Sequence, residues 1–181
     1  MARVVALFAV LSLYSIKATA TTYVYFSPNG GCEQRIVQLL DGATETIKAV
    51  VYAVNNPNIV NALKRARSRG VSVQLLTDRL QAFNKSSSAL ELRKYPIDIK
   101  IHSWAKIEHN KFVVVDGRYL ETGSFNWTGP AQNQNSENCM FMDAKRTVYA
   151  FAQRFEQLWS LNSREKSEEY FRRINDRLDD F

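Results

Sequence analysis

His109-Asn-Lys111-Phe-Val-Val-Val-Asp116-Gly-Arg-Tyr-Leu-Glu-Thr-Gly123-Ser124-Phe-Asn126 is the segment around which we build the predicted fold. Its β-branched run predicts a buried strand, Asp116-Gly117 predicts a turn, and Tyr119 to Thr122 predicts the returning strand. Such a hairpin brings Gly123 to Asn126 back beside His109 and Lys111, whose side chains leave the same face of an extended segment. An imidazole, an ammonium, a hydroxyl, an amide and backbone N–H groups next to a glycine are suited to holding a phosphate.

The length and composition indicate an ordinary globular protein. The chain has 181 residues, of which 45% are hydrophobic and 23% charged, so it is long enough for one domain with a proper core and short for two domains of average size. We see no internal repeat.

Residues 1–20 are predicted to be an export signal. They combine a short positive start, an uncharged apolar run from Val4 to Ile16 and the small-residue sequence Ala18-Thr-Ala20, which is typical of a cleaved signal peptide. A retained membrane anchor is the alternative, although the apolar run is shorter than the roughly 20 residues that span a bilayer. We therefore expect a periplasmic or secreted protein with no stable membrane insertion after signal removal.

The charge and the cysteines leave two questions open. The formal net charge is +6, and removal of residues 1–20 takes away Arg3 and Lys17 and no acid, which leaves a modest positive excess. This excess fits a polyanionic partner or a solvated surface equally well. Cys32 and Cys139 could form one bridge in an oxidising compartment or remain buried and unpaired.

Strands and helices are predicted to alternate along residues 21–162. Expected strands are 23–26, 46–54, 71–77, 97–101, 112–115, 119–122 and 136–142, and expected helices are 32–40, 59–68 and 144–161, with helical pieces within 79–94. This order predicts an α/β fold with a mixed, mostly parallel central sheet flanked by helices. Residues 163–181 are predicted to be a charged C-terminal helical extension with a narrower apolar stripe that includes Tyr170, Phe171 and Ile174. The alternatives for its role are an outlying helix, a partner contact and a frayed tail.

The spacing H-x-K-x4-D-x6-G-S-x-N resembles the signature of the phospholipase D superfamily. All six positions are present, and they are His109, Lys111, Asp116, Gly123, Ser124 and Asn126. Asn135-Ser-Glu137-Asn138 is similar to the segment in which that family places a glutamate near the catalytic histidine. The resemblance implies a phospholipase D-like fold for residues 21–162.

The resemblance also implies a role for each residue. His109 would be the nucleophile or the proton donor, Lys111 and Asn126 would hold the non-bridging phosphate oxygens with support from Ser124 and Gly123, and Glu137 would hydrogen-bond the imidazole. We assign Asp116 to the turn and its hydrogen bonds.

One motif per chain implies that the active site lies across a homodimer. In-line displacement at phosphorus needs a nucleophile on one side and a proton donor on the other, and one imidazole cannot occupy both places. The chain has one further histidine, His102, which has no lysine two residues on. The resemblance is to the small exported endonucleases of the superfamily.

The sequence therefore predicts a metal-independent phosphodiesterase that cleaves DNA, and possibly RNA, with little sequence preference and through a phosphohistidine. No cofactor and no obligate metal are expected, because no clustered carboxylates or Cys-x-x-Cys lie near His109. The alternatives are phospholipase D-type hydrolysis of lipid headgroups and a catalytically silent nucleic-acid-binding protein. The intact His109, Lys111 and Asn126 argue against the silent alternative.

Overall fold

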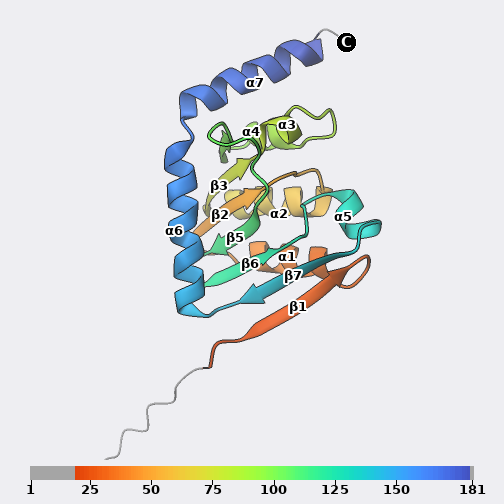
Figure 1. The fold of residues 1–181 in the computed structure, drawn as a ribbon, viewed down its shortest axis with the longest axis vertical. Helices are drawn as coiled ribbons and strands as arrows, with labels where there is room; N and C mark the ends of the chain where they lie inside the picture. The colour runs from red at the N-terminus through yellow and green to blue at the C-terminus, as the bar shows by residue number, and fades with distance from the viewer. Residues whose placement is uncertain (1–18, 180–181) are drawn as a thin grey trace, which may run out of the picture.

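The computed structural model describes residues 19–179, which form one open sheet with helices on both faces (Figure 1). The strands are β1 (Thr22–Ser27), β2 (Thr46–Val51), β3 (Ser72–Thr77), β4 (Asp98–Ile101), β5 (Lys111–Val115), β6 (Tyr119–Gly123) and β7 (Glu137–Met142). The helices are α1 (Cys32–Asp41), α2 (Pro57–Ser68), α3 (Arg79–Ala82), α4 (Ala89–Arg93), α5 (Gly129–Asn133), α6 (Lys145–Leu161) and α7 (Arg164–Asp179).

The sheet is mixed, as expected, and its strand order is β1-β7-β6-β5-β2-β3-β4. β2, β3 and β4 pair in parallel, because a helical crossover follows both β2 and β3. The other neighbouring pairs in the described sheet are antiparallel. Most strands point the same way, but β5 and β7 run opposite to the rest, so the expected parallel pairing is confined to the β2–β4 half.

Two apolar layers cover the sheet. Along β5, Val113 and Val115 face the larger core under α1 and α2, whereas Phe112 and Val114 face the smaller core under α6. Every residue of β5 is buried, which explains why its sequence is a continuous apolar run rather than an alternating one. β5 is the central strand of the sheet, and it begins at Lys111. The motif therefore begins in the middle of one end of the sheet, where strands start and finish.

The C-terminal extension is a helix that packs against the sheet. Phe171 and Ile174 of α7 are buried in the larger core, and the Ser167 hydroxyl accepts a hydrogen bond from the backbone N–H of Ile101 at the end of β4. The apolar stripe in the charged segment 163–181 therefore faces this chain's own β4 edge.

A disulfide joins Cys32 at the start of α1 to Cys139 in β7. The Cα atoms are 5.9 Å apart, within the usual range for such a bridge. Of the two possibilities left by the sequence, the structure has the bridged one, which ties a helix of the larger core to the strand that carries Glu137.

The predicted export signal falls almost wholly on residues 1–18, which lie outside the described residues. Within residues 19–179, no helix combines the length and the apolar character that a membrane span requires.

Candidate active site

The motif residues other than Asp116 meet at one end of the sheet. The predicted hairpin is confirmed, with Phe112 opposite Thr122 and Val115 opposite Tyr119. β2 ends at Val51, directly opposite Lys111, and β7 begins at Glu137, so the start of β5, the end of β6 and the start of β7 lie side by side. Three antiparallel neighbours thus place their functional ends together.

The segment after the hairpin is held over the end of β2. The carbonyl oxygen of Trp127 accepts hydrogen bonds from the backbone N–H groups of Asn55 and Asn56, and the N–H of Trp127 donates to Ala53. The indole of Trp127 is buried. The structure places this indole in the larger core.

His109 presents an exposed imidazole above Tyr52. The two rings meet edge to face with their centroids 4.7 Å apart. The backbone around His109 is fixed, because Tyr52 N–H donates to the Asn110 carbonyl at 3.0 Å and Lys111 Nζ donates to the His109 carbonyl at 2.6 Å. A solvent-facing imidazole on a restrained backbone is available to a substrate.

Lys111 is a buried cation below this imidazole. Its side chain is 6% exposed, and Nζ lies 5.3 Å from the centroid of the Tyr52 ring, so His109 and Lys111 share one aromatic neighbour. Burial lowers the pKa of Lys111, and the carboxylates of Glu137 and Glu108 oppose this shift by favouring the charged form. The ammonium is thereby poorly hydrated and free to attract an anion.

Ser124 and Glu137 form a pair beside Lys111. The Ser124 hydroxyl donates to one oxygen of Glu137 and accepts from the backbone N–H of Asn138, while Asn135 Nδ2 donates to the other Glu137 oxygen. The expected hydrogen bond from Glu137 to His109 is not formed among residues 19–179. The β6–β7 register sets Glu137 next to Ser124, so the carboxylate binds the nearer hydroxyl.

Asn126 and Gly123 complete the site in different ways. Asn126 lines a polar cleft together with Tyr52, Gln81 and Thr128, and within the described residues its buried Oδ1 has no hydrogen-bond partner. Gly123 is required by packing, because a Cβ there would lie 2.3 Å from the Asn138 carbonyl oxygen.

Asp116 lies at the other end of the hairpin, away from this group. Its carboxylate accepts hydrogen bonds from the backbone N–H groups of Thr44, Glu45 and Thr46 and from the Thr44 hydroxyl. Burial alone would raise the pKa of Asp116, but these hydrogen bonds together lower it. Asp116 therefore fixes the loop before β2 to the β5–β6 turn.

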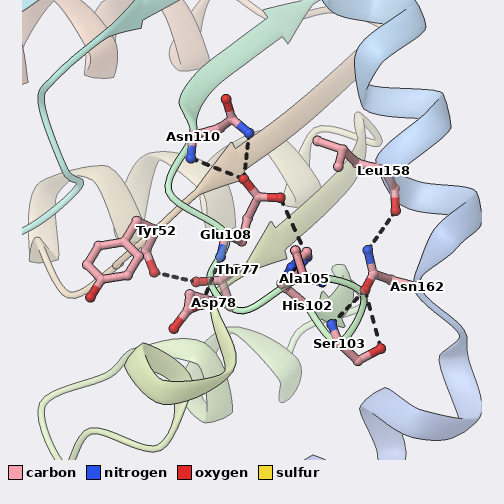
Figure 2. Close-up of polar contacts among 10 residues, drawn as sticks. All are labelled: Tyr52, Thr77, Asp78, His102, Ser103, Ala105, Glu108, Asn110, Leu158 and Asn162. Atoms are coloured by element: carbon pink, nitrogen blue, oxygen red, sulfur yellow. Dashed lines mark hydrogen bonds and ion pairs between the residues drawn. The ribbon is translucent and has the colours of Figure 1, made fainter.

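A buried polar network under His109 was missed by the sequence analysis (Figure 2). His102 and Glu108 are 1% and 3% exposed, and Glu108 Oε2 lies 3.5 Å from His102 Nδ1. The other Glu108 oxygen accepts from the backbone and the side-chain amide of Asn110, and the Glu108 N–H donates to Asp78.

The hydrogen bonds of this network fix the tautomer of His102. Its Nε2 accepts from the backbone N–H of Ala105 at 3.0 Å, so the proton of the neutral ring is on Nδ1, facing Glu108. The acid at position 108 directly precedes the motif histidine, but it is not one of the exposed site residues. It is instead an internal support for the segment that carries His109.

A second buried acid, Glu121, lies on β6 between Val113 and Phe141. Its side chain is fully buried, neither oxygen has a hydrogen-bond partner within residues 19–179, and burial raises its pKa to about 8. The alternation of β6 could have identified it, since Glu121 shares the strand face of a buried core.

Within residues 19–179, no group of three or more His, Cys, Asp or Glu side chains is arranged to hold a metal ion. The charged and polar groups around His109 instead include Lys111, Ser124, Glu137 and Asn126. The mixed sheet presents an imidazole, a buried ammonium and an amide together at one end of its strands. This combination defines a phosphoryl-transfer enzyme of the histidine–lysine–aspartate motif type.

Comparison with known proteins agrees with this class. The family described as "Cardiolipin synthase, PLD-like domain" matches residues 36–159. A protein of Rickettsia prowazekii named phospholipase D is 34% identical over 147 residues, which cover 80% of this chain and 72% of that protein. A protein of Chlamydomonas reinhardtii named mitochondrial cardiolipin hydrolase is 32% identical over 70% of this chain, but the match spans only 57% of that relative.

Among solved structures, the phospholipase D family member Nuc from Salmonella typhimurium matches with a TM-score of 0.76 and 28% identity, over 80% of this chain and 97% of Nuc. NucT from Helicobacter pylori shares the fold, with a TM-score of 0.75 at 22% identity. The chain belongs to the phospholipase D superfamily and is a phosphodiesterase of that superfamily.

Proposed function

We propose that this protein is a metal-independent endonuclease that cleaves DNA with little sequence preference, with RNA as the further substrate to be tested. The observation that carries the proposal is the exposed imidazole of His109 above the buried ammonium of Lys111. This motif occurs once in the chain, and the chain matches nearly the whole of Nuc. A site in which protein groups supply both the nucleophile and the positive charge has no step that requires a metal.

The mechanism uses two copies of His109. A ring nitrogen of one His109 attacks phosphorus, so a P–N bond forms while the P–O bond to the leaving oxygen breaks, and the imidazolium of the second copy gives that oxygen its proton. Water then gives a proton to the second imidazole and attacks phosphorus, which breaks the P–N bond and restores both rings.

The remaining site residues hold charge in this scheme. Lys111 and Asn126 bind the non-bridging oxygens, where negative charge accumulates, and the backbone next to Gly123 and the Ser124 hydroxyl support them. Glu137 orients Ser124 through the hydrogen bond described above and favours the charged form of Lys111. Direct orientation of an imidazole by Glu137 would require its carboxylate to leave Ser124 and Asn135.

The active unit is an isologous homodimer, because each chain contributes one motif. The two-fold axis would pass beside both copies of His109, with Lys111 and Asn126 facing across it. The polar segment from Gly123 to Gln134 would then be covered on dimer formation.

Cleavage of plasmid DNA in excess EDTA tests the nuclease assignment. The protein should keep its activity, and His109→Ala should abolish it by at least about 10⁴-fold, since nucleophile and acid are both removed. The His109 side chain is exposed, so the variant should melt at the wild-type temperature, which separates lost chemistry from lost folding. Complete loss of wild-type cleavage on chelation would contradict metal independence.

Phospholipase D-type hydrolysis is the second candidate, favoured by the names of the Rickettsia and Chlamydomonas relatives. Both substrates present the same phosphodiester to His109. Release of a headgroup from vesicles faster than the turnover on DNA would reverse the order of the two candidates, and silence of both assays would favour a binding protein.

For the location, we propose export with removal of residues 1–20. Mass spectrometry of the protein recovered from its native host should give a chain that begins near Thr21. A full-length mass would instead support a retained anchor.

A further inference from the structure

An exposed apolar surface with a positive rim lies next to the candidate active site. We call it the 80/104/107 surface, after Leu80 of α3 and Trp104 and Ile107 of the loop that leads to His109. Their exposed fractions are 61%, 56% and 45%, values that contrast with the buried state of Trp127. Large apolar side chains exposed together in this way mark interaction sites more often than chance placement.

The two segments that carry these residues are bound together. Arg79 Nη2 donates to the Lys106 carbonyl, and the Glu108 N–H donates to Asp78 Oδ2 at 2.9 Å. Leu80 and Ile107 are therefore neighbours on one surface although they are 27 positions apart in the numbering.

The backbone is hydrogen-bonded on both sides of Trp104, and Figure 2 shows the flanking residues Ser103 and Ala105 with their partners. On its N-terminal side the Ser103 N–H donates to Asn162 Oδ1 at 2.7 Å, and on its C-terminal side the Ala105 N–H donates to His102 Nε2 at 3.0 Å. Asn162 and His102 are buried. The fixed backbone on both sides means that the exposure of the indole is built into the fold.

The charges around this surface have one sign. Lys106 is exposed and Arg79 half-buried, whereas the two acids of the same segments, Asp78 and Glu108, are buried and hydrogen-bonded internally. An indole with aliphatic neighbours and a cationic rim is the composition of a segment that lies in the headgroup region of an anionic membrane.

We propose that the 80/104/107 surface docks this protein on anionic phospholipid bilayers. Aliphatic Leu80 and Ile107 gain nothing from stacking on bases, which argues against nucleic acid as the occupant.

Docking would set the candidate active site at the lipid surface. Ile107 is two residues before His109, and Gln81, next to Leu80, donates to the Tyr52 hydroxyl at 2.9 Å, below the imidazole. The inference does not depend on which phosphodiester the site cleaves, because surface binding is measured without turnover.

Flotation with vesicles is the test. The wild type should float with vesicles of equal parts phosphatidylcholine and phosphatidylglycerol and remain unbound with phosphatidylcholine alone. Trp104→Ser with Leu80→Ser should weaken binding at least about tenfold, because interfacial binding scales with the apolar area inserted. The matched control, Tyr149→Ser with Val24→Ser, removes one exposed aromatic and one exposed aliphatic residue from α6 and β1 and should bind as the wild type does.

The charge contribution is tested separately. Lys106→Gln should weaken binding about fivefold, which is the contribution of one basic residue at an anionic surface. Lys145→Gln replaces a lysine of α6 that is also exposed, and it should leave binding unchanged. Equal effects of the two lysine variants would show that only net charge matters and would overturn a defined docking surface.

Tryptophan emission identifies the inserted residue. Anionic vesicles should shift the emission to the blue and protect it from iodide, and Trp104→Phe should keep flotation but lose the shift. Absence of flotation, a shift produced by DNA instead of vesicles, or a shift that depends on protein concentration alone would each overturn the proposal, the last two in favour of nucleic acid and of a second copy.

Discussion

At the scale of single residues, Glu121 should make the stability of this protein depend on pH. Its pKa is about 8 in the folded chain against an ordinary value of 4.5, so the unfolded chain loses this proton first. The contribution of Glu121 to the free energy of unfolding is therefore largest below pH 4.5. It falls by a few kcal/mol as the pH rises toward 8.

Urea unfolding of the wild type and Glu121→Gln across this range measures the effect. The glutamine cannot ionise, so its stability should vary less between pH 5 and 8 than that of the wild type. Asp116→Asn is the control with the opposite sign and a different range, since the Asp116 pKa is lowered from its ordinary value of 3.8: its contribution is unchanged between pH 5 and 8 and is lost only as the pH falls below that value. Parallel curves for the wild type and Glu121→Gln would contradict the buried, neutral state of Glu121.

His102 is the second residue for which the structure changes the expectation. The sequence indicates no catalytic role for His102, because no lysine lies two residues on, but the residue is buried under the His109 segment. His102→Ala should lower stability by about 1–3 kcal/mol, because it leaves the Ala105 N–H unpaired and removes the ring that faces Oε2 of Glu108.

The activity of His102 variants separates support from chemistry. His102→Ala should reduce kcat moderately, and His102→Asn, which retains an acceptor, should recover part of the loss. His109→Ala should leave no turnover at all. Equal and complete loss in both alanine variants, with both proteins folded, would mean that the catalytic histidine is wrongly assigned.

At the scale of elements, α7 is expected to be part of the folded core. Phe171 is fully buried among residues of the larger core, so Phe171→Ala should cost about 3–5 kcal/mol. Phe171→Leu, which keeps most of the volume, should cost less. A melting temperature unchanged by Phe171→Ala would show that α7 does not pack on the β4 edge in solution.

Most elements were predictable, either because their apolar periodicity is strong, as in α6, or because their apolar run is continuous, as in β5. The start of α2 at Pro57 rather than Ile59 follows from Asn56, whose side chain caps the helix by accepting from Asn58 and Ile59 N–H groups. Pairing of β2 with β5 was not predictable, because it joins strands 60 positions apart and no local pattern specifies it.

The candidate site was predicted as a set of residues but not as a set of contacts. The hairpin fixed the positions of Lys111 and Ser124 by local spacing, so these were accessible from the sequence. The partner of Glu137 depends on the β6–β7 register, and the burial of Glu108 depends on the packing of Asp78 and His102 around it. Long-range packing therefore decided what spacing alone left open.

At the scale of the whole molecule, the proposed two-histidine mechanism requires the proposed homodimer, so a test of one is a test of the other. Each chain presents one exposed His109, and in-line displacement with a histidine acid requires two. A mixture of His109→Ala and Lys111→Ala chains should recover little activity, because every composite site lacks at least one of its four charged groups.

The measurement that tests this claim most directly is sedimentation of the mature protein across a dilution series, with specific activity followed in the same samples. The account predicts a dimer at high concentration and a loss of specific activity that tracks the fraction of monomer as the protein is diluted. A monomer that keeps full specific activity would contradict both the dimer and the two-histidine mechanism.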